Sequence, residues 1–260
     1  MTESGAGAGK KFMGFKRDGR KPGARNDLWI IAADPGLMET LEVMAHEYHK
    51  PYWIDSVVLL GGAEAPFSEA YSLAWGLAAN PNAAGLLLAG REGDELFISY
   101  VMDRLWMEGE GGSSHVRRMI IQGENPDESE ETFCSLLDRL AAYSSRTRAG
   151  FDVSDLFVGL VYDEESRKLA HECAGRLVSL GCRAACANLA VSPEGSAYES
   201  LVFLGAQVIV ETSIRTGASS CAVPVARIRE IPELTERLSR GEPEHGELAG
   251  DIFSFVLSVF

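Results

Sequence analysis

Short apolar runs alternate with helical patterns along most of this 260-residue chain. The runs are rich in Val, Ile, Leu and Ala and lack polar alternation, as do strands that are covered on both faces of a sheet. We expect eight such strands, at Leu28–Ala33, Ser56–Leu60, Gly85–Ala89, Met119–Gln122, Leu156–Val161, Arg183–Ala187, Val208–Glu211 and Val223–Ile228.

The segments between these strands carry the period of helices. Apolar residues recur every three or four positions in Met38–His49, Glu128–Arg146 and Glu164–Leu180. Pro126 is suited to the first turn of the second helix, and Gly181 to the end of the third. Alternation of this kind predicts an α/β fold with mostly parallel sheets and helices on both faces.

The segment Ala149–Ser154 separates two series of strands and helices. We therefore predict two Rossmann-like α/β lobes, at residues 12–150 and 151–260, after a flexible leader at residues 1–11. The site of such a fold is expected in the crevice between the lobes or beyond the carboxyl ends of the strands. The sequence shows no strong internal repeat.

Charge and composition exclude several classes of protein. The net charge of −14 argues against nucleic acid as a partner, because such binders neutralise phosphates with basic side chains. No apolar run approaches the roughly 20 residues that cross a bilayer. The first eleven residues lack the apolar centre of a signal peptide, and five cysteines do not describe a secreted disulfide framework. These features predict a cytoplasmic protein.

One basic turn stands out in this acidic chain. Lys10–Arg25 contains seven basic residues and one acid, Asp18, which predicts attraction of a small anion. Arg20 and Arg25 are candidates to clamp a carboxylate, Asn26 to bind a hydroxyl, and Asp18 to orient an arginine. The alternative is a tight turn in which Asp18 caps backbone amides and both arginines are solvated.

Polar residues also follow three of the expected strands. Asp94 and Asp163 are candidates for acid–base catalysis or for holding a cation. Acids at these positions equally suit helix N-termini, where the helix dipole stabilises them. Arg215 lies in the loop Thr212–Gly217, which is either an anion-binding loop or an ordinary turn.

The basic turn resembles a known family. Asp18-Gly19-Arg20, Gly23 and Arg25-Asn26 before an apolar strand are similar to the opening of the catalytic part of the altronate/galactarate dehydratase family. The similarity extends over about residues 12–245. It includes Asn80-Pro81-Asn82, Val158-Gly159-Leu160, Gln207–Thr212, Arg215 and Pro224–Ile228.

This resemblance implies a lyase that eliminates water from a hexonate or hexarate sugar acid, with an anion-binding set and two catalytic acids. The substrate-binding positions are Asp18, Arg20, Arg25, Asn26 and Arg215, and the catalytic positions are Asp94 and Asp163. The alternative is a non-catalytic paralogue or partner subunit that keeps the anion pocket. A generic nucleotide-binding protein is a third hypothesis, and the oligomeric state, including a homo-oligomer, stays open.

Family members depend on a metal, but the cysteines of the family's loops are replaced in this chain. Asp34-Pro35, Glu92-Gly93-Asp94 and Tyr162–Ser166 stand at those positions. Two alternatives follow from the resemblance. Either oxygen ligands such as Asp34, Asp94 and Asp163 hold a divalent metal such as iron or manganese, or the metal has been lost.

Overall fold

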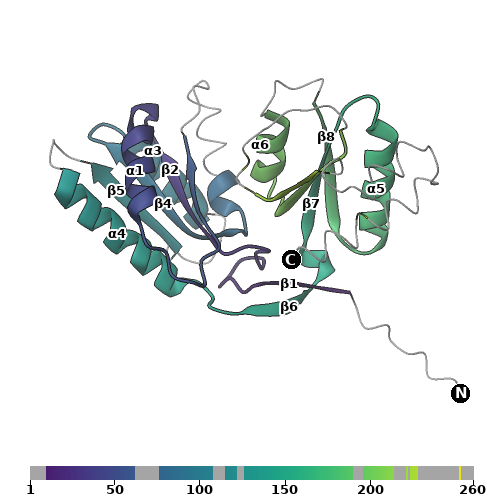
Figure 1. Ribbon diagram of the computed structural model, residues 1–260, viewed down its shortest axis with the longest axis horizontal. Helices are drawn as coiled ribbons and strands as arrows, with labels where there is room; N and C mark the ends of the chain where they lie inside the picture. Colours follow the sequence, from purple (N-terminus) through teal and green to yellow (C-terminus); the bar gives the residue numbers. More distant parts are fainter. Residues whose placement is uncertain are drawn as a thin grey trace, which may run out of the picture.

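The structure is a computed structural model of the chain. It describes residues 10–61, 76–107, 115–121, 126–189, 196–213, 221, 223–227 and 252. Two four-stranded parallel sheets lie in two lobes, and a two-stranded antiparallel ribbon runs beneath them (Figure 1). The predicted α/β class with two lobes and parallel sheets is confirmed.

The first lobe contains β2 (Asp27–Ala32), β3 (Val57–Leu60), β4 (Ala83–Arg91) and β5 (Val116–Ile121), in the order β3-β2-β4-β5. The helices are α1 (Met38–Glu47), α3 (Glu95–Met107) and α4 (Pro126–Tyr143). Residues Leu41 of α1 and Leu137 of α4 pack with Ile30 on one face of the sheet. On the other face, α3 contributes Val101 to the cluster that contains Trp29.

The second lobe contains β7 (Phe157–Tyr162), β8 (Arg183–Asn188), β9 (Val208–Glu211) and β10 (Val225–Arg227), with helices α5 (Arg167–Ser179) and α6 (Ser196–Phe203). The order is β8-β7-β9-β10. In each sheet, the strand that comes second in the chain lies at one edge, followed across the sheet by the first, the third and the fourth. This shared topology is a structural repeat that the sequence does not reveal.

All eight predicted strands are present, with ends that differ from the predictions by three residues or fewer. The helix predicted to stop at Gly181 does so. This glycine has φ of 96°, a conformation that favours glycine, and Cys182 N donates to the Leu177 carbonyl at 3.0 Å. No helix among the described residues has the length and apolar character needed to cross a membrane.

A buried cluster joins the two lobes. Leu86 and Leu88 of the first sheet share it with Leu201 of α6 and Ile209 of β9. Asn80 also spans the junction, because its side-chain amide donates to the carbonyls of Val202 and Ala206, both at 3.0 Å. Apolar packing and buried hydrogen bonds therefore fix one lobe against the other.

The ribbon consists of β1 (Lys11–Phe15) and β6 (Arg148–Asp152), two strands that the sequence analysis did not predict. Lys11, assigned there to the leader, is the first residue of β1. The segment Ala149–Ser154, expected as a boundary, contains most of β6. The pairing brings the rings of Phe12 and Phe151 to 6.0 Å, so a contact between segments far apart in the chain makes both strands.

Candidate functional site

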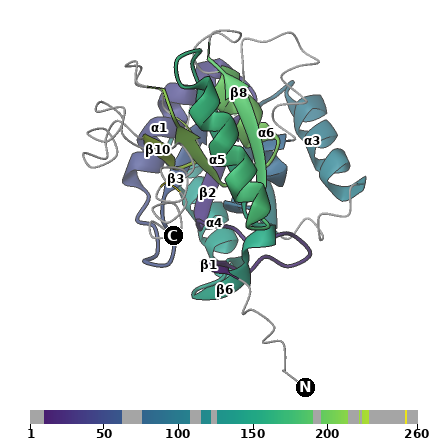
Figure 2. The ribbon, with the colours of Figure 1, turned by 90° about the vertical axis from the view of Figure 1, so that its right-hand side faces the viewer.

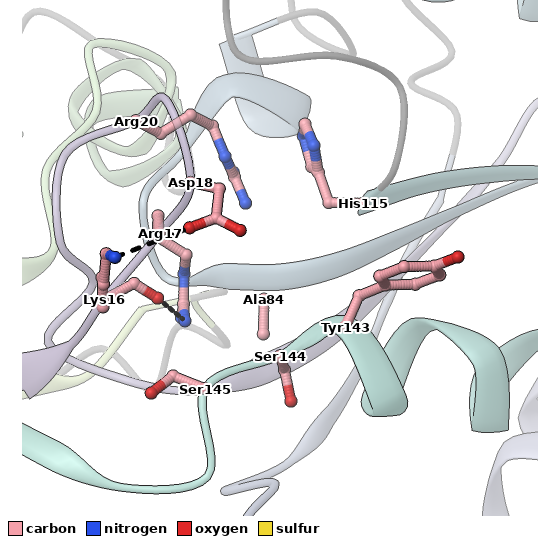
Figure 3. Close-up of a pocket in the computed structure, with 9 residues that line it drawn as sticks. All are labelled: Lys16, Arg17, Asp18, Arg20, Ala84, His115, Tyr143, Ser144 and Ser145. Atoms are coloured by element: carbon pink, nitrogen blue, oxygen red, sulfur yellow. Dashed lines mark hydrogen bonds and ion pairs between the residues drawn. The ribbon is translucent and has the colours of Figure 1, made fainter.

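The described part of the chain contains a polar pocket of about 220 Å³ at the amino edge of the first sheet (Figure 3). Its walls come from the turn after β1, the start of β4, the residue before β5 and the end of α4. The lining residues are Lys16, Arg17, Asp18, Arg20, Ala84, His115, Tyr143, Ser144 and Ser145. The pocket therefore lies at the amino ends of the strands. The two places where a site was expected are the crevice between the lobes and the region beyond the carboxyl ends of the strands.

Arg20 is the predicted binding residue that the structure places most firmly in this pocket. Its side chain is partly buried, and Nη2 donates to the carbonyl of Ala83 at 3.0 Å. This bond ties the turn to the start of β4. His115, which is buried, lines the same pocket from the amino end of β5 (Figure 3). A guanidinium and an imidazole thus reach one cavity from two different elements.

Asp18 and Lys16 lie at the exposed rim of the pocket. The Lys16 ammonium is 4.0 Å from a carboxylate oxygen of Asp18, and the two side chains are 74% and 92% exposed. Water screens an ion pair this exposed, so it adds little to stability. Both side chains are consequently available to a ligand that enters the pocket.

Arg17 also lines the pocket, but its guanidinium is occupied by the protein itself. Nε donates to the Pro81 carbonyl at 3.0 Å, and Nη2 donates to the Arg25 carbonyl at 2.7 Å. Burial, with the nearby Arg20 charge, lowers the pKa of Arg17 to about 9, which leaves it charged at pH 7. Arg17 therefore builds one wall of the pocket and adds a fixed positive charge to it.

Arg25 and Asn26 do not line the pocket. The Nε of Arg25 donates to both carboxylate oxygens of Asp27 at 3.2 Å. Asn26 is fully buried, and its side-chain nitrogen Nδ2 donates to the carbonyls of Trp53 at 2.7 Å and Ser145 at 2.9 Å. Both predicted binding residues therefore lie outside the lining of the pocket. Asn26 supports the pocket through its bond to Ser145, which is a lining residue.

Asp27 is the buried centre of this supporting network. Burial raises its pKa, while the Ser56 hydroxyl, which donates to it at 2.6 Å, and Arg25 oppose the shift. Ser56 reaches the carboxylate because β2 and β3 are parallel neighbours, whereas Arg25 lies two residues before Asp27 in the chain. Asp27 does not line the pocket. With its cation and its hydroxyl donor, this buried acid therefore has a structural role.

The two predicted catalytic acids lie at the carboxyl ends of strands, one in each lobe, and neither lines the pocket. Asp94 accepts a hydrogen bond from the Arg91 amide at 2.7 Å, just before α3. Asp163 accepts from the Ser166 amide at 2.9 Å and from the Ser213 hydroxyl at 2.7 Å. The bond from the Ser166 amide, just before α5, fits the alternative of an acid at a helix N-terminus, whereas Asp94 accepts from a residue that precedes its helix. Arg215 lies outside the described residues.

The described residues do not supply a metal centre. They contain no group of three or more His, Cys, Asp or Glu side chains that could hold an ion. Asp34, one of the suggested oxygen ligands, lies 3.3 Å from the guanidinium of Arg91. Among the described residues, Asp34, Asp94 and Asp163 therefore belong to no group that could hold iron or manganese, and we derive no step through a metal.

Sequence reasoning missed half of the pocket. Lys16 was part of the basic turn, but His115 and the segment Tyr143–Ser145 gave no signal. They are separated from the turn by about a hundred residues or more, and only the packing of α4 and β5 beside β4 brings them there.

Comparison with models of known protein families finds no match, and no curated protein matches this chain significantly.

Proposed function

We propose that this chain binds a hexonate or hexarate sugar acid in the pocket at the amino edge of the first sheet. The observation that carries the proposal is the grouping of Lys16 and Arg20 with Tyr143, Ser144 and Ser145 around one cavity. Ammonium and guanidinium groups attract a carboxylate. The Ser144 and Ser145 hydroxyls donate to the carbonyls of Ala141 at 2.7 Å and Thr147 at 3.0 Å, so each keeps acceptor lone pairs for a hydroxyl group of a sugar acid.

The size of the pocket favours a small ligand. Its volume of about 220 Å³ lies below the roughly 300–1,000 Å³ of pockets that enclose drug-sized molecules. A six-carbon acid suits such a space better than a nucleotide. The family resemblance of the basic turn supports the same class of ligand, because Asp18 and Arg20 belong to both the turn and the pocket.

Elimination of water is the second candidate function, because a carboxylate and an imidazole line the same pocket as the cations. Asp18 or His115 would remove the proton from the carbon next to the substrate carboxylate. The electron pair would form the carbon–carbon double bond as the neighbouring hydroxyl takes a proton from the other of these two groups and leaves as water. The enol product then rearranges to a 2-keto-3-deoxy acid. A chain that binds without turnover would instead be the non-catalytic paralogue.

Calorimetric titration tests the binding proposal. We expect D-galactarate or D-altronate to bind, and the uncharged polyol galactitol and ATP not to bind. Arg20→Gln should weaken binding about tenfold to a hundredfold, since a hydrogen bond to a charged group contributes about 1.5–3 kcal/mol. Arg167→Gln is the matched control, because Arg167 is 59% exposed on α5 of the other lobe.

The result that contradicts the proposal is equally direct. If no sugar acid binds, or if Arg20→Gln binds as tightly as the wild type, the pocket is not a carboxylate site. Formation of a 2-keto-3-deoxy acid, lost in His115→Gln or Asp18→Asn while binding persists, would establish the lyase. Binding of every acid in the panel with no product would establish the non-catalytic alternative.

A further inference from the structure

Among the described helices and strands, the ribbon of β1 and β6 lies lowest in two perpendicular views, with β6 outermost (Figures 1 and 2). Its register is regular from Lys11 opposite Asp152 to Phe15 opposite Arg148. Among the described strands, β6 has β1 as its one neighbour. One long edge of β6 therefore borders no described strand.

The pattern of hydrogen bonds shows which residues form that edge. Val153 N donates to the Lys10 carbonyl at 3.2 Å, so the backbone of Val153 faces β1. Backbone groups alternate in direction along an antiparallel strand. Those of Ala149 and Phe151 consequently face β1 as well, whereas those of Arg148, Gly150 and Asp152 face outward.

The other strand of the ribbon confirms this alternation. Phe15, which is paired with Arg148, directs its backbone away from β6. Its N–H donates to the Gly23 carbonyl at 2.7 Å, and its carbonyl accepts from Gly23 N at 2.9 Å. The turn thus covers the outer edge of β1 at Phe15, and β6 has no equivalent cover from a described strand.

We propose that the outer edge of β6 pairs with β6 of a second copy of this chain. The two strands run antiparallel about a twofold axis at Gly150 and join two ribbons into one four-stranded sheet. In this register Gly150 faces Gly150 of the second copy, and Arg148 faces Asp152 in both directions. All three outward-facing residues then form hydrogen-bonded pairs, because each has its N–H and carbonyl directed at the partner strand.

The chemistry of the strand selects a second copy over another partner. Arg148 and Asp152 are equidistant from Gly150, so a twofold axis there places each charge opposite its complement. Opposite charges in directly facing positions stabilise a strand pair, whereas like charges destabilise it. The isologous contact of a twofold dimer needs this self-complementarity. Residues 148–152 also contain no proline or lysine, the residues that commonly protect an edge.

The solvent face of the ribbon adds an apolar contact near the same axis. Met13 pairs with Gly150 and is 46% exposed. Because Gly150 has no side chain, the two Met13 side chains can lie over the central pair of glycines. Arg148 also contacts its own chain, since its guanidinium lies over the Phe15 ring at 5.1 Å and 3.7 Å from Asp55.

Sedimentation equilibrium of the full chain tests the proposal, with Gly150→Pro as the variant. Proline removes the outward N–H of Gly150 and keeps the inward bonds of β6, so we expect a dimer for the wild type and a monomer for this variant. Gly150→Ala is the matched control, because it retains the N–H and its Cβ meets Cδ of the Lys11 side chain at 3.3 Å. It should remain a dimer.

Charge exchange gives a second readout. Arg148→Asp has two acids on the edge, and Asp152→Arg has two bases, so each variant alone should be a monomer. Mixed in equal amounts, they should form a heterodimer, because every facing pair is then complementary. A monomeric wild type at 100 µM, a dimer that survives Gly150→Pro, or a mixture that stays monomeric would each overturn the proposal.

Discussion

The side-chain oxygen of Asn26 accepts a hydrogen bond from Nη1 of Arg17 at 2.9 Å in the protein interior. This contact joins the turn after β1 to the residue that precedes β2. Arg17 also reaches the Pro81 carbonyl before β4, so one guanidinium holds together three segments that surround the pocket. The basic turn therefore has two parts, an inner one that supports the fold and an outer one that faces the cavity.

Replacement of Arg17 by Met should destabilise the protein by about 2–4 kcal/mol in urea unfolding at pH 7. Several buried acceptors would lose their donor, and each such group costs about 1–3 kcal/mol. Arg17→Lys should lose much of the same stability, because an ammonium cannot reproduce the planar fork of donors. Arg167→Gln, at an exposed site, should change stability by less than about 0.5 kcal/mol. Equal stabilities for Arg17→Met and the wild type would contradict the structural role.

Removal of Arg227 should also be costly. Its Nε lies 3.0 Å from Glu211, whose side chain is 2% exposed, and the two residues are register partners on β10 and β9. Arg227→Met leaves a buried carboxylate without this cation, for which we expect a loss of about 3–5 kcal/mol. The double variant Arg227→Met, Glu211→Leu should recover part of the loss. A double-mutant cycle by chemical unfolding measures the coupling, and a coupling near zero would refute the assignment.

Two glycine substitutions should have opposite effects. A Cβ at Gly159 of β7 would lie 2.9 Å from the Leu201 side chain of α6, so Gly159→Ala should cost about 1–3 kcal/mol through overpacking. A Cβ at Gly175 of α5 would meet nothing within 4 Å. Gly175→Ala should therefore stabilise the helix by about 0.5–1 kcal/mol. Thermal unfolding of both variants checks the pair, and the same sign for both would show that α6 does not pack closely on β7.

The pH dependence of stability should change in Asp27→Asn. Burial raises the pKa of Asp27 in the folded protein above its unfolded value, so the unfolded chain releases this proton at lower pH. The ionisation of Asp27 does not change the free energy of unfolding below the unfolded pKa of about 3.9. It lowers that free energy as pH rises toward the raised value. The stability of Asp27→Asn relative to the wild type should therefore increase between pH 3.5 and pH 7. Altered hydrogen bonds add a constant offset, so a difference that does not vary with pH would exclude the shift.

Asp18→Asn separates the two candidate functions of the pocket. Asp18 adds negative charge to the rim, so its removal should tighten the binding of a sugar acid about two- to fivefold, the size expected for an exposed charge. If Asp18 is the base of an elimination, the same variant should lose turnover while it binds more tightly. Calorimetry and product formation measured on one preparation distinguish these outcomes. Weaker binding would place Asp18 among the groups that hold the ligand.

The architecture was largely readable from the sequence, because it depends on local patterns. Apolar runs such as Val208–Glu211 are covered on both faces, and Met38–Glu47 carries one apolar stripe, so each element is specified by its own residues. The end of α5 was likewise predicted from one residue close by, Gly181. Strands β1 and β6 were missed because each is made a strand by the other, across more than 130 residues.

The site divides in the same way between local and long-range information. The sequence by itself determined an α/β chain with a cationic turn, and it singled out Asp18 and Arg20. Only the tertiary structure decided that Arg17 is buried, that Arg25 pairs with Asp27, and that His115 and Ser144 complete the pocket. The physical reason is that a basic residue carries the same charge wherever it lies, whereas its partners are set by which distant strands and helices pack beside it.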